Sequence, residues 1–364
     1  MHKPPPTNKK GEINSEPWQK GRVFIGLLTA NALLASTAHG LEIRLNAAAG
    51  MTQDSIDGFT RAATYWENTL SDNTIIYIDI DFRALDPGVL GQAGSTTQSV
   101  GVADYYTALI NDVTSQTDIT AVANLSPLSV NGGLTFVTNV FDSGTNTMIL
   151  GVDNDDSANN RVLDMNTANA KAVGLYTGVD GASDASITFS DSFSWDYDNA
   201  DGINLGHQDF VGVAIHEIGH SLGFVSGVDT MDFIVDNPQG VDQFRIFSGL
   251  DMFRYSADDT LDLSVATASY FSIDGGANAL GLFSTGSSNG DGRQASHWKD
   301  NQLTGIQLGI LDPTAQAAGT ANEVTTLDLL ALDAIGWNLT PVPEPSSTLL
   351  VGLGFASLLI RRNR

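Results

Sequence analysis

"DFVGVAIHEIGHSLGF", residues 209–224, is the stretch that decides the fold. It predicts a helix from about Phe210 to Leu222. Asp209 is a suitable N-cap, because its carboxylate can accept a hydrogen bond from a free N–H group of the first turn. Gly223 suits the sharp turn with which a helix ends. The sequence therefore predicts a helix whose two ends are both marked.

This predicted helix carries the pattern H-E-x-x-H. His216 and His220 are four residues apart, so they share one face of the helix and can bind one metal ion. Glu217 projects beside them and is placed to take a proton from water. A catalytic zinc ion usually has three protein ligands. In the extended motif H-E-x-x-H-x-x-G-x-x-H the third ligand follows six residues after the second histidine, where this chain has Ser226, a poor zinc ligand.

Several residues are candidates for the third ligand. His297 is the one histidine that follows His220 in the sequence. Its distance along the chain is no obstacle, because the cost of closing a loop grows only logarithmically with length. Asp229 and Asp232 are close downstream, and aspartate is also a zinc ligand. His207 precedes the helix, in a predicted turn. The residues alone leave these alternatives open.

A second stretch, "DGRQASHWKDNQLTGIQLGILDPT" (residues 291–314), resembles the leishmanolysin-type metalloproteases, a branch of the metzincins. In that family a long insertion separates the zinc-binding helix from a third histidine in a Ser-His-Trp context, which Ser296, His297 and Trp298 match. A methionine-containing turn then follows and packs beneath the zinc ion. Leu311 stands at the methionine position of this turn. The resemblance implies that His297 is the third zinc ligand.

The spacing of apolar residues predicts the remaining elements. Helices are expected at 51–70 and at 102–114, where Tyr106, Leu109, Ile110 and Val113 would share a face, with a short helix at 166–175. Strands are expected at 74–82, 134–141, 147–152 and 185–190, and a loop-rich region at 229–292. Helices and strands are mixed rather than strictly alternating, which favours an α+β fold.

The family resemblance implies a metzincin-like arrangement of these elements. A mixed N-terminal sheet would carry the active-site helix, and a loop-rich C-terminal subdomain would follow. The expected organisation is a signal peptide (1–40), a zinc metalloprotease domain (41–340) and a sorting signal (341–364). The domain would divide into subdomains at about 41–224 and 225–340. The strand at 185–190 would be the sheet edge that pairs with an extended substrate.

Both ends of the chain are typical of targeting segments. Lys20 and Arg22 precede a short apolar run, "VFIGLLTANALLA", and small residues follow near Ala38, as in a secretory signal peptide. At the other end, Val-Pro-Glu-Pro (342–345), a short apolar stretch and an arginine cluster resemble a PEP-CTERM sorting signal. That tail implies transient membrane contact, processing by an exosortase-type enzyme, and export to the cell surface or biofilm matrix of a Gram-negative bacterium.

Composition limits the possible partners and cofactors. The formal net charge of −25 argues against a nucleic-acid partner, because such a surface repels phosphate. The absence of cysteine means that this exported chain depends on its core and on metals rather than on disulfides. Two aspartate-rich stretches, 153–156 and 196–202, are weaker candidates for binding Ca²⁺, since they lack the spacing of an EF-hand.

The resulting expectation is a secreted zinc-dependent endopeptidase that cleaves a protein or peptide substrate. Zn²⁺ would be held by His216, His220 and His297, with Glu217 as the general base. The alternative is a non-catalytic surface or matrix protein in which zinc is structural. A structural site closes all four coordination positions, with His207 as a conceivable fourth ligand, and it has no need of Glu217.

Overall fold

The computed structural model describes residues 40–176 and 178–341. Within these ranges helices and strands are interspersed, so the predicted α+β class is confirmed. The predicted signal peptide up to residue 39 and the sorting signal from residue 342 lie outside the described residues.

The largest sheet has four strands in the order β1 (Glu42–Ala47), β2 (Ile75–Phe82), β8 (Ala185–Phe189) and β3 (Gly91–Ser95). The first three are parallel, and β3 runs antiparallel to β8. The predicted strands at 74–82 and 185–190 are therefore present. The prediction that 185–190 forms the edge is wrong, because β8 lies between β2 and β3. The edge strand is β3, whose sequence GQAGS has too few apolar residues to signal a strand.

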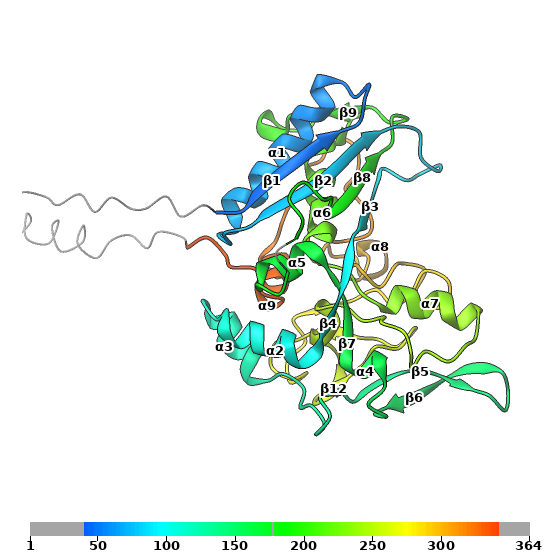
Figure 1. The fold of residues 1–364 in the computed structure, drawn as a ribbon. Helices are drawn as coiled ribbons and strands as arrows, with labels where there is room; N and C mark the ends of the chain where they lie inside the picture. Colours follow the sequence, from blue (N-terminus) through cyan, green and yellow to red (C-terminus); the bar gives the residue numbers. More distant parts are fainter. Residues whose placement is uncertain (1–39, 177, 342–364) are drawn as a thin grey trace, which may run out of the picture. The chain divides into compact units, whose positions relative to one another are not determined.

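Two helices pack against each other and against this sheet (Figure 1). They are α1 (Gln53–Thr69), as predicted at 51–70, and α6 (Phe210–Ser221), as predicted at 210–222. Phe59 of α1 contacts Phe210 of α6 edge-to-face, with ring centroids 5.0 Å apart. Gly58 permits this approach, since a Cβ atom there would lie 2.5 Å from the Phe210 ring. Helix α6 is thus held against α1 at its first residue.

The helix predicted at 102–114 is present as α2 (Val102–Asn111), and an unpredicted helix, α3 (Gln116–Ala123), follows it. Ser115 caps α3 in a reciprocal capping box, which starts this new helix just after the predicted one ends. Tyr106 and Leu109 are buried as expected, but Ile110 is 56% exposed. The buried face of α2 is therefore rotated relative to the predicted face.

Several small ladders surround the main sheet. The strands predicted at 134–141 and 147–152 form an antiparallel hairpin of β5 (Phe136–Asp142) and β6 (Thr147–Asp153). The short helix predicted at 166–175 is also present. The other elements between residues 97 and 209 are β4 (Thr97–Gly101), α4 (Ala158–Arg161), β7 (Val162–Asn166), α5 (Thr167–Ala172), β9 (Trp195–Asp196), η1 (Asn199–Asp201) and β10 (Gln208–Asp209).

The region 229–292, predicted as loop-rich, contains more regular structure than expected. It begins with α7 (Val228–Asp236) and includes a four-stranded sheet in the order β12-β11-β13-β14. These strands have two to four residues each, too few to produce a period in the sequence. The elements are η2 (Leu250–Phe253), β11 (Arg254–Ala257), β12 (Thr260–Leu261), β13 (Tyr270–Phe271), β14 (Gly281–Leu282), and, after this region, α8 (Asn301–Thr304) and α9 (Thr326–Ala334).

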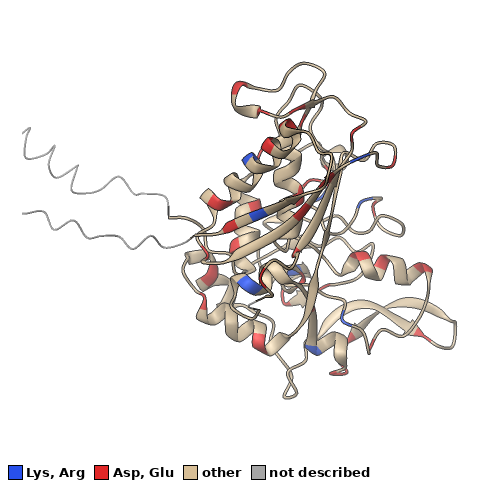
Figure 2. Ribbon diagram, turned by 45° about the horizontal axis from the view of Figure 1, so that its top comes forward, with Lys and Arg blue, Asp and Glu red and all other residues tan. Residues whose placement is uncertain are grey.

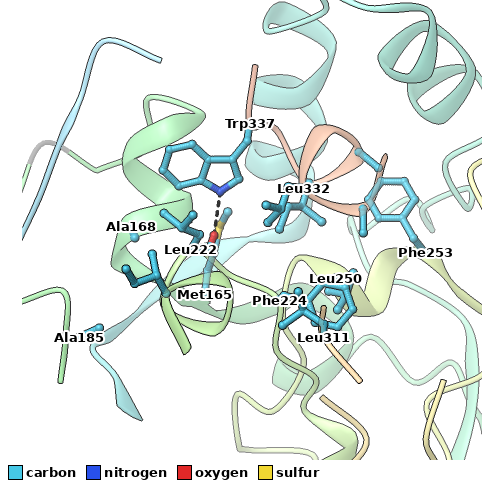
Figure 3. Close-up of a cluster of buried hydrophobic side chains, with 14 of the residues drawn as sticks. Met165, Ala168, Ala185, Leu222, Phe224, Leu250, Phe253, Leu311, Leu332 and Trp337 are labelled. Carbon is cyan, nitrogen blue, oxygen red and sulfur yellow. Dashed lines mark hydrogen bonds between the residues drawn. The ribbon is translucent and has the colours of Figure 1, made fainter. Parts of the chain in front are cut away.

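The core joins α6 to the last helix of the described chain. Trp337, just after α9, is buried and donates a hydrogen bond from its indole nitrogen to the Leu222 carbonyl at 2.7 Å (Figure 3). Leu222 is the C-cap of α6, so this bond holds the end of the helix. Acidic residues occur on many elements, whereas basic residues are few (Figure 2). The described chain thus combines an apolar core with a strongly acidic exterior.

Candidate metal centre

Helix α6 holds its two histidines through contacts at both ends and along its length. The Asp209 carboxylate accepts a hydrogen bond from the Gly212 amide at 2.9 Å, which confirms the predicted N-cap. At the other end Gly223 has φ of 118°, a conformation that favours glycine. Between them the indole of Trp66 donates to the Ile215 carbonyl at 3.1 Å. The direction of each side chain on this helix is therefore fixed by the fold.

His297 comes from a segment without regular secondary structure and lies against α6. Its Nε2 atom is 3.1 Å from Nε2 of His220, which in turn is 3.0 Å from Nε2 of His216. The potential ligand atoms of the three residues all lie within 4.8 Å of one another. A tetrahedral zinc ion with Zn–N bonds of about 2.0–2.1 Å separates its nitrogen ligands by about 3.3 Å. The spacing of the three rings therefore fits such an ion.

The opposite ring nitrogens determine which tautomer each histidine adopts. Nδ1 of His216 lies 2.6 Å from the Ile310 carbonyl, and Nδ1 of His220 lies 2.7 Å from the Phe224 carbonyl. Nδ1 of His297 faces the Gln294 carbonyl at 3.4 Å. Since a carbonyl can only accept, we assign the proton of each ring to Nδ1. Three unprotonated Nε2 atoms then converge, an arrangement that a cation would stabilise.

The surroundings keep these rings neutral. Burial lowers the pKa of His220 to about 3, and the neighbouring His216 adds to this shift. Burial also lowers the pKa of His216, and it lowers that of His297 well below the usual range. A metal competes with protons for the same nitrogen. At neutral pH all three rings are therefore available as ligands.

Glu217 lies next to this group and faces the edge strand. Its carboxylate oxygen would be 3.2 Å from a Cβ atom added at Gly91, the first residue of β3. No hydrogen bond to this carboxylate occurs within the described ranges, and the residue is only 6% exposed. Burial raises the pKa of Glu217 to about 8. A carboxyl group with this pKa can both accept and release a proton near neutral pH.

A cleft of about 800 Å³ opens over these residues. Its walls include Gly91–Ala93 of the edge strand on one side and Pro313–Ala317 on the other. His216, His220, His297 and Glu217 all line it. The group is therefore reachable by a ligand of considerable size, unlike a metal site enclosed in a core.

The other candidates for the third ligand are engaged elsewhere. Asp229 accepts hydrogen bonds from the amides of Ala295 and Ser296 at 2.6 and 3.0 Å. Asp232 accepts from residues 287–289 of another loop. The Ser226 hydroxyl donates to Asp251. Among the described residues the histidine group has three members, and His207 is not one of them.

One residue that the sequence did not single out supports the site from α9. Asp328 accepts from the Trp298 indole at 2.8 Å and from the Ile310 amide at 2.9 Å. It thereby holds both the residue after His297 and the residue whose carbonyl orients His216. Only the spatial proximity of these segments reveals this role, because nothing in the local sequence distinguishes Asp328 from the many other aspartates.

Leu311, whose sequence context resembles the methionine-containing turn, is completely buried under α6. A Cβ atom added at Gly219 would lie 3.3 Å from both of its methyl groups. Gly219 immediately precedes His220 in the helix. Leu311 therefore packs against the helix turn that carries the second histidine, and an apolar side chain of this size fills the space.

The aspartate-rich stretches considered for calcium use their carboxylates in local hydrogen bonds. Asp153 accepts from the side-chain amides of Asn159 and Asn160 at 2.9 and 3.0 Å. Asp196 accepts from the backbone amides of Asp198 and Asn204 at 3.1 and 2.8 Å. These bonds account for the shape of both loops, and calcium binding there stays a prediction.

Comparison with known proteins identifies the tail. A family model described as the PEP-CTERM protein-sorting motif matches residues 341–364. No curated protein and no solved structure matches the chain significantly. No helix in the described ranges is long and apolar enough to cross a membrane. The sorting motif indicates an exported, cell-surface-directed protein that an exosortase-type enzyme recognises.

Proposed function

We propose that this protein is an exported zinc-dependent endopeptidase. The observation that carries the proposal is the convergence of three Nε2 atoms on the floor of an open cleft, with the Glu217 carboxyl group beside them. Three neutral imidazoles are a common ligand set for catalytic zinc, which keeps one position open for water or substrate. The next residue along the helix from His216 supplies the acid–base group that hydrolysis requires.

The chemistry divides between the ion and the chain. Bound zinc would polarise the carbonyl of the scissile bond and lower the pKa of a water molecule. Glu217 would accept a proton from that water and later deliver it to the amine that leaves. Its burial supports this role, because a raised pKa makes the carboxylate a stronger base, and its protonated form then persists near neutral pH to deliver the proton.

The edge strand supports a peptide as the substrate. Strand β3 pairs with β8 on one side and ends the sheet order on the other. Its residues Gly91–Ala93 line the cleft beside Glu217. An extended peptide could add to this edge through main-chain hydrogen bonds, which bind any sequence, while side-chain pockets would select among sequences. In this proposal β3, rather than the segment 185–190, aligns the substrate.

The rival function, a structural zinc site, is less well supported. Such a site closes all four coordination positions with protein ligands. The described part of the chain brings three candidate ligands together, and they face a cleft. A buried glutamate beside the ligands also has no purpose in a closed site, where its desolvation is only a cost.

We further propose that the protease belongs with the leishmanolysin-like metzincins, on the residues given above. The support is the order H-E-x-x-H, a long insertion, Ser296-His297-Trp298, and a buried turn under the helix at Leu311. The match of residues 341–364 to a sorting motif adds that the enzyme acts outside the cytoplasm. An intact-mass measurement on secreted protein tests that part, since a mature chain that retains "LLIRRNR" would contradict it.

The central test is zinc-dependent proteolysis by the purified mature protein. We expect about one zinc ion per chain and hydrolysis of casein. Treatment with a chelator should abolish the hydrolysis, and added zinc should restore it. Zinc binding without hydrolysis of casein or of a mixed peptide library would favour the structural site instead.

A further inference from the structure

The three histidines are not equally well held by their own side-chain bonds. The Nδ1 hydrogen bonds of His216 and His220 are 2.6 and 2.7 Å long, whereas that of His297 is 3.4 Å, near the limit of a hydrogen bond. The first two rings also project from one helix, while His297 follows His220 after 77 residues. The position of His297 must therefore be fixed by contacts other than the hydrogen bond of its own ring.

The backbone just before His297 is bound by a carboxylate of helix α7. Asp229, in the first turn of α7, accepts from the amides of Ala295 and Ser296 at 2.6 and 3.0 Å. It also accepts from the Ser296 hydroxyl, and that hydroxyl accepts from the Ser226 amide at 2.9 Å. Three donors on two consecutive residues fix both the position and the direction of the chain that leads into His297.

The opposite side of the same backbone is bound as well. Arg254 is 1% exposed and donates to the Ala295 carbonyl at 3.2 Å. The Ser284 amide donates to the carbonyl of His297 at 3.0 Å. With its peptide groups bound on both sides, the segment has little freedom to move, and the imidazole is the part that faces the cleft.

We propose that Asp229 is the positioning residue for the third metal ligand: it binds no metal itself but sets the location of His297. The inference rests on the proposed zinc site. It also explains why an aspartate stands close after the helix without serving as a ligand, since both of its oxygens are occupied by the segment that carries His297. Outer carboxylates of this kind typically contribute about 10–100-fold to metal affinity.

The test uses the full mature protein and measures zinc affinity by competition with a chromophoric chelator. Asp229→Asn should weaken zinc binding by about 10–100-fold. Asp232→Asn is the matched control, because Asp232 lies on the same helix and accepts from the Ser288 and Asn289 amides, both at 2.8 Å, in a loop without a ligand. It should change zinc affinity by less than about threefold. Equal affinities for wild type and Asp229→Asn would overturn the proposal.

Cobalt substitution separates positioning from direct ligation and from general loss of structure. A positioning role predicts that Asp229→Asn, once saturated with Co²⁺, shows visible d–d bands of wild-type shape, because the three histidines still bind. A changed spectrum at saturation would mean that Asp229 is itself a ligand and would refute the idea. If Asp229→Asn does not fold, Ser296→Ala removes one of the three donors and should weaken zinc binding by about 3–10-fold; no change there would also refute it.

These outcomes are distinct from failure of the proposed function. Wild-type protein that binds zinc through the histidines but cleaves no peptide would refute the endopeptidase and leave the positioning role intact. Wild-type protein that binds no zinc would refute both. An active enzyme with normal zinc affinity in Asp229→Asn would refute the positioning role alone.

Discussion

Helix α6 presents His216 and His220 from one rigid element, whereas residues 294–299 present His297 from a chain without regular structure. The helix depends on its N-cap, its terminal glycine and the core beneath it. The later segment depends on side chains that come from α7, β11 and α9. The imidazoles from both segments meet: Nε2 of His220 is 3.0 Å from Nε2 of His216 and 3.1 Å from Nε2 of His297.

The difference shows how the proposed metal site would combine local and distant parts of the chain. A helix fixes two ligands at little cost in conformational entropy, because the residues are already ordered for other reasons. A loop ligand must be ordered separately, and here two carboxylates do so: Asp229 accepts from backbone amides and Asp328 accepts from the Trp298 indole. The loop half of the site should therefore be the more sensitive half when supporting residues are changed.

The largest effect should come from the acid–base group on the helix half. Glu217→Gln keeps the size of the side chain but removes the proton acceptor, so kcat/KM should fall by about 10³–10⁴-fold. Zinc content should stay at the wild-type value, because the three histidines are unchanged. Activity assays and metal analysis on the same sample check both statements. Parallel loss of zinc would mean that Glu217 is a ligand and would contradict its assignment as a base.

How far the sequence predicted these two halves follows from the range of the contacts involved. The helix at 210–222, its Asp209 cap and its Gly223 end could be read locally, and all three are confirmed. His297 was one of several candidates from the residues, and only a family resemblance selected it. The supporting Asp229 and Asp328 could not be recognised, because each acts on residues far along the chain.

The errors in the predicted fold also arise where local sequence carries little signal. Strand β3 was missed because an edge strand needs little apolar character, and GQAGS has almost none. Helix α3 was missed because its start depends on a side-chain cap at Ser115 that periodicity does not detect. The small sheet at 254–282 is made of strands too short for any pattern. The long, periodic elements and the short helix α5 were predicted correctly, whereas β3, α3 and the strands of two to four residues were not.

The second-largest effect should come from removing His297, the residue that the irregular segment 294–299 contributes. His297→Ala should weaken zinc binding by more than about 100-fold, since losing a ligand must cost more than losing an outer partner. Ser226→Ala, at the position where the extended motif has its third histidine, should change zinc affinity by less than about tenfold. Its own hydrogen bond to Asp251 is buried, so it should instead lower thermal stability. Tight stoichiometric zinc binding by His297→Ala would remove this residue from the site.

A third prediction uses the cost of burying Glu217 in the metal-free protein. Its pKa is about 8 when folded and near 4.5 when exposed, so the folded state binds its proton more tightly. Stability from this group is therefore full below pH 4.5 and is lost as pH rises towards 8. Glu217→Gln should thus be more stable than wild type at pH 8.5 by roughly 2–4 kcal/mol, with a smaller gap at pH 5.

Chemical denaturation of both metal-free proteins at the two pH values checks this sign. The buried histidines have lowered pKa values, so they reduce stability as pH falls below about 6.5. That term is common to both proteins and cancels in their difference. A gap that shrinks from pH 5 to pH 8.5 would contradict the prediction.

The smallest effect on activity should come from Leu311→Met, because Leu311 contacts both α6 and the segment that carries His297. Leu311 packs against Gly219 of the helix, and its amide and carbonyl bind Asp328 and the Trp298 amide of the later segment. Leu311→Met keeps the volume and the apolar character, so it should cost less than about 1.5 kcal/mol and change kcat/KM by less than about threefold. Leu311→Ala leaves a cavity and should cost about 2–5 kcal/mol. Denaturation curves and casein assays on both variants compare them. A large gain in activity for Leu311→Met would show that a sulfur atom, rather than packing alone, is needed under the metal. Equal loss of zinc affinity in both variants would show that the shape of leucine is required.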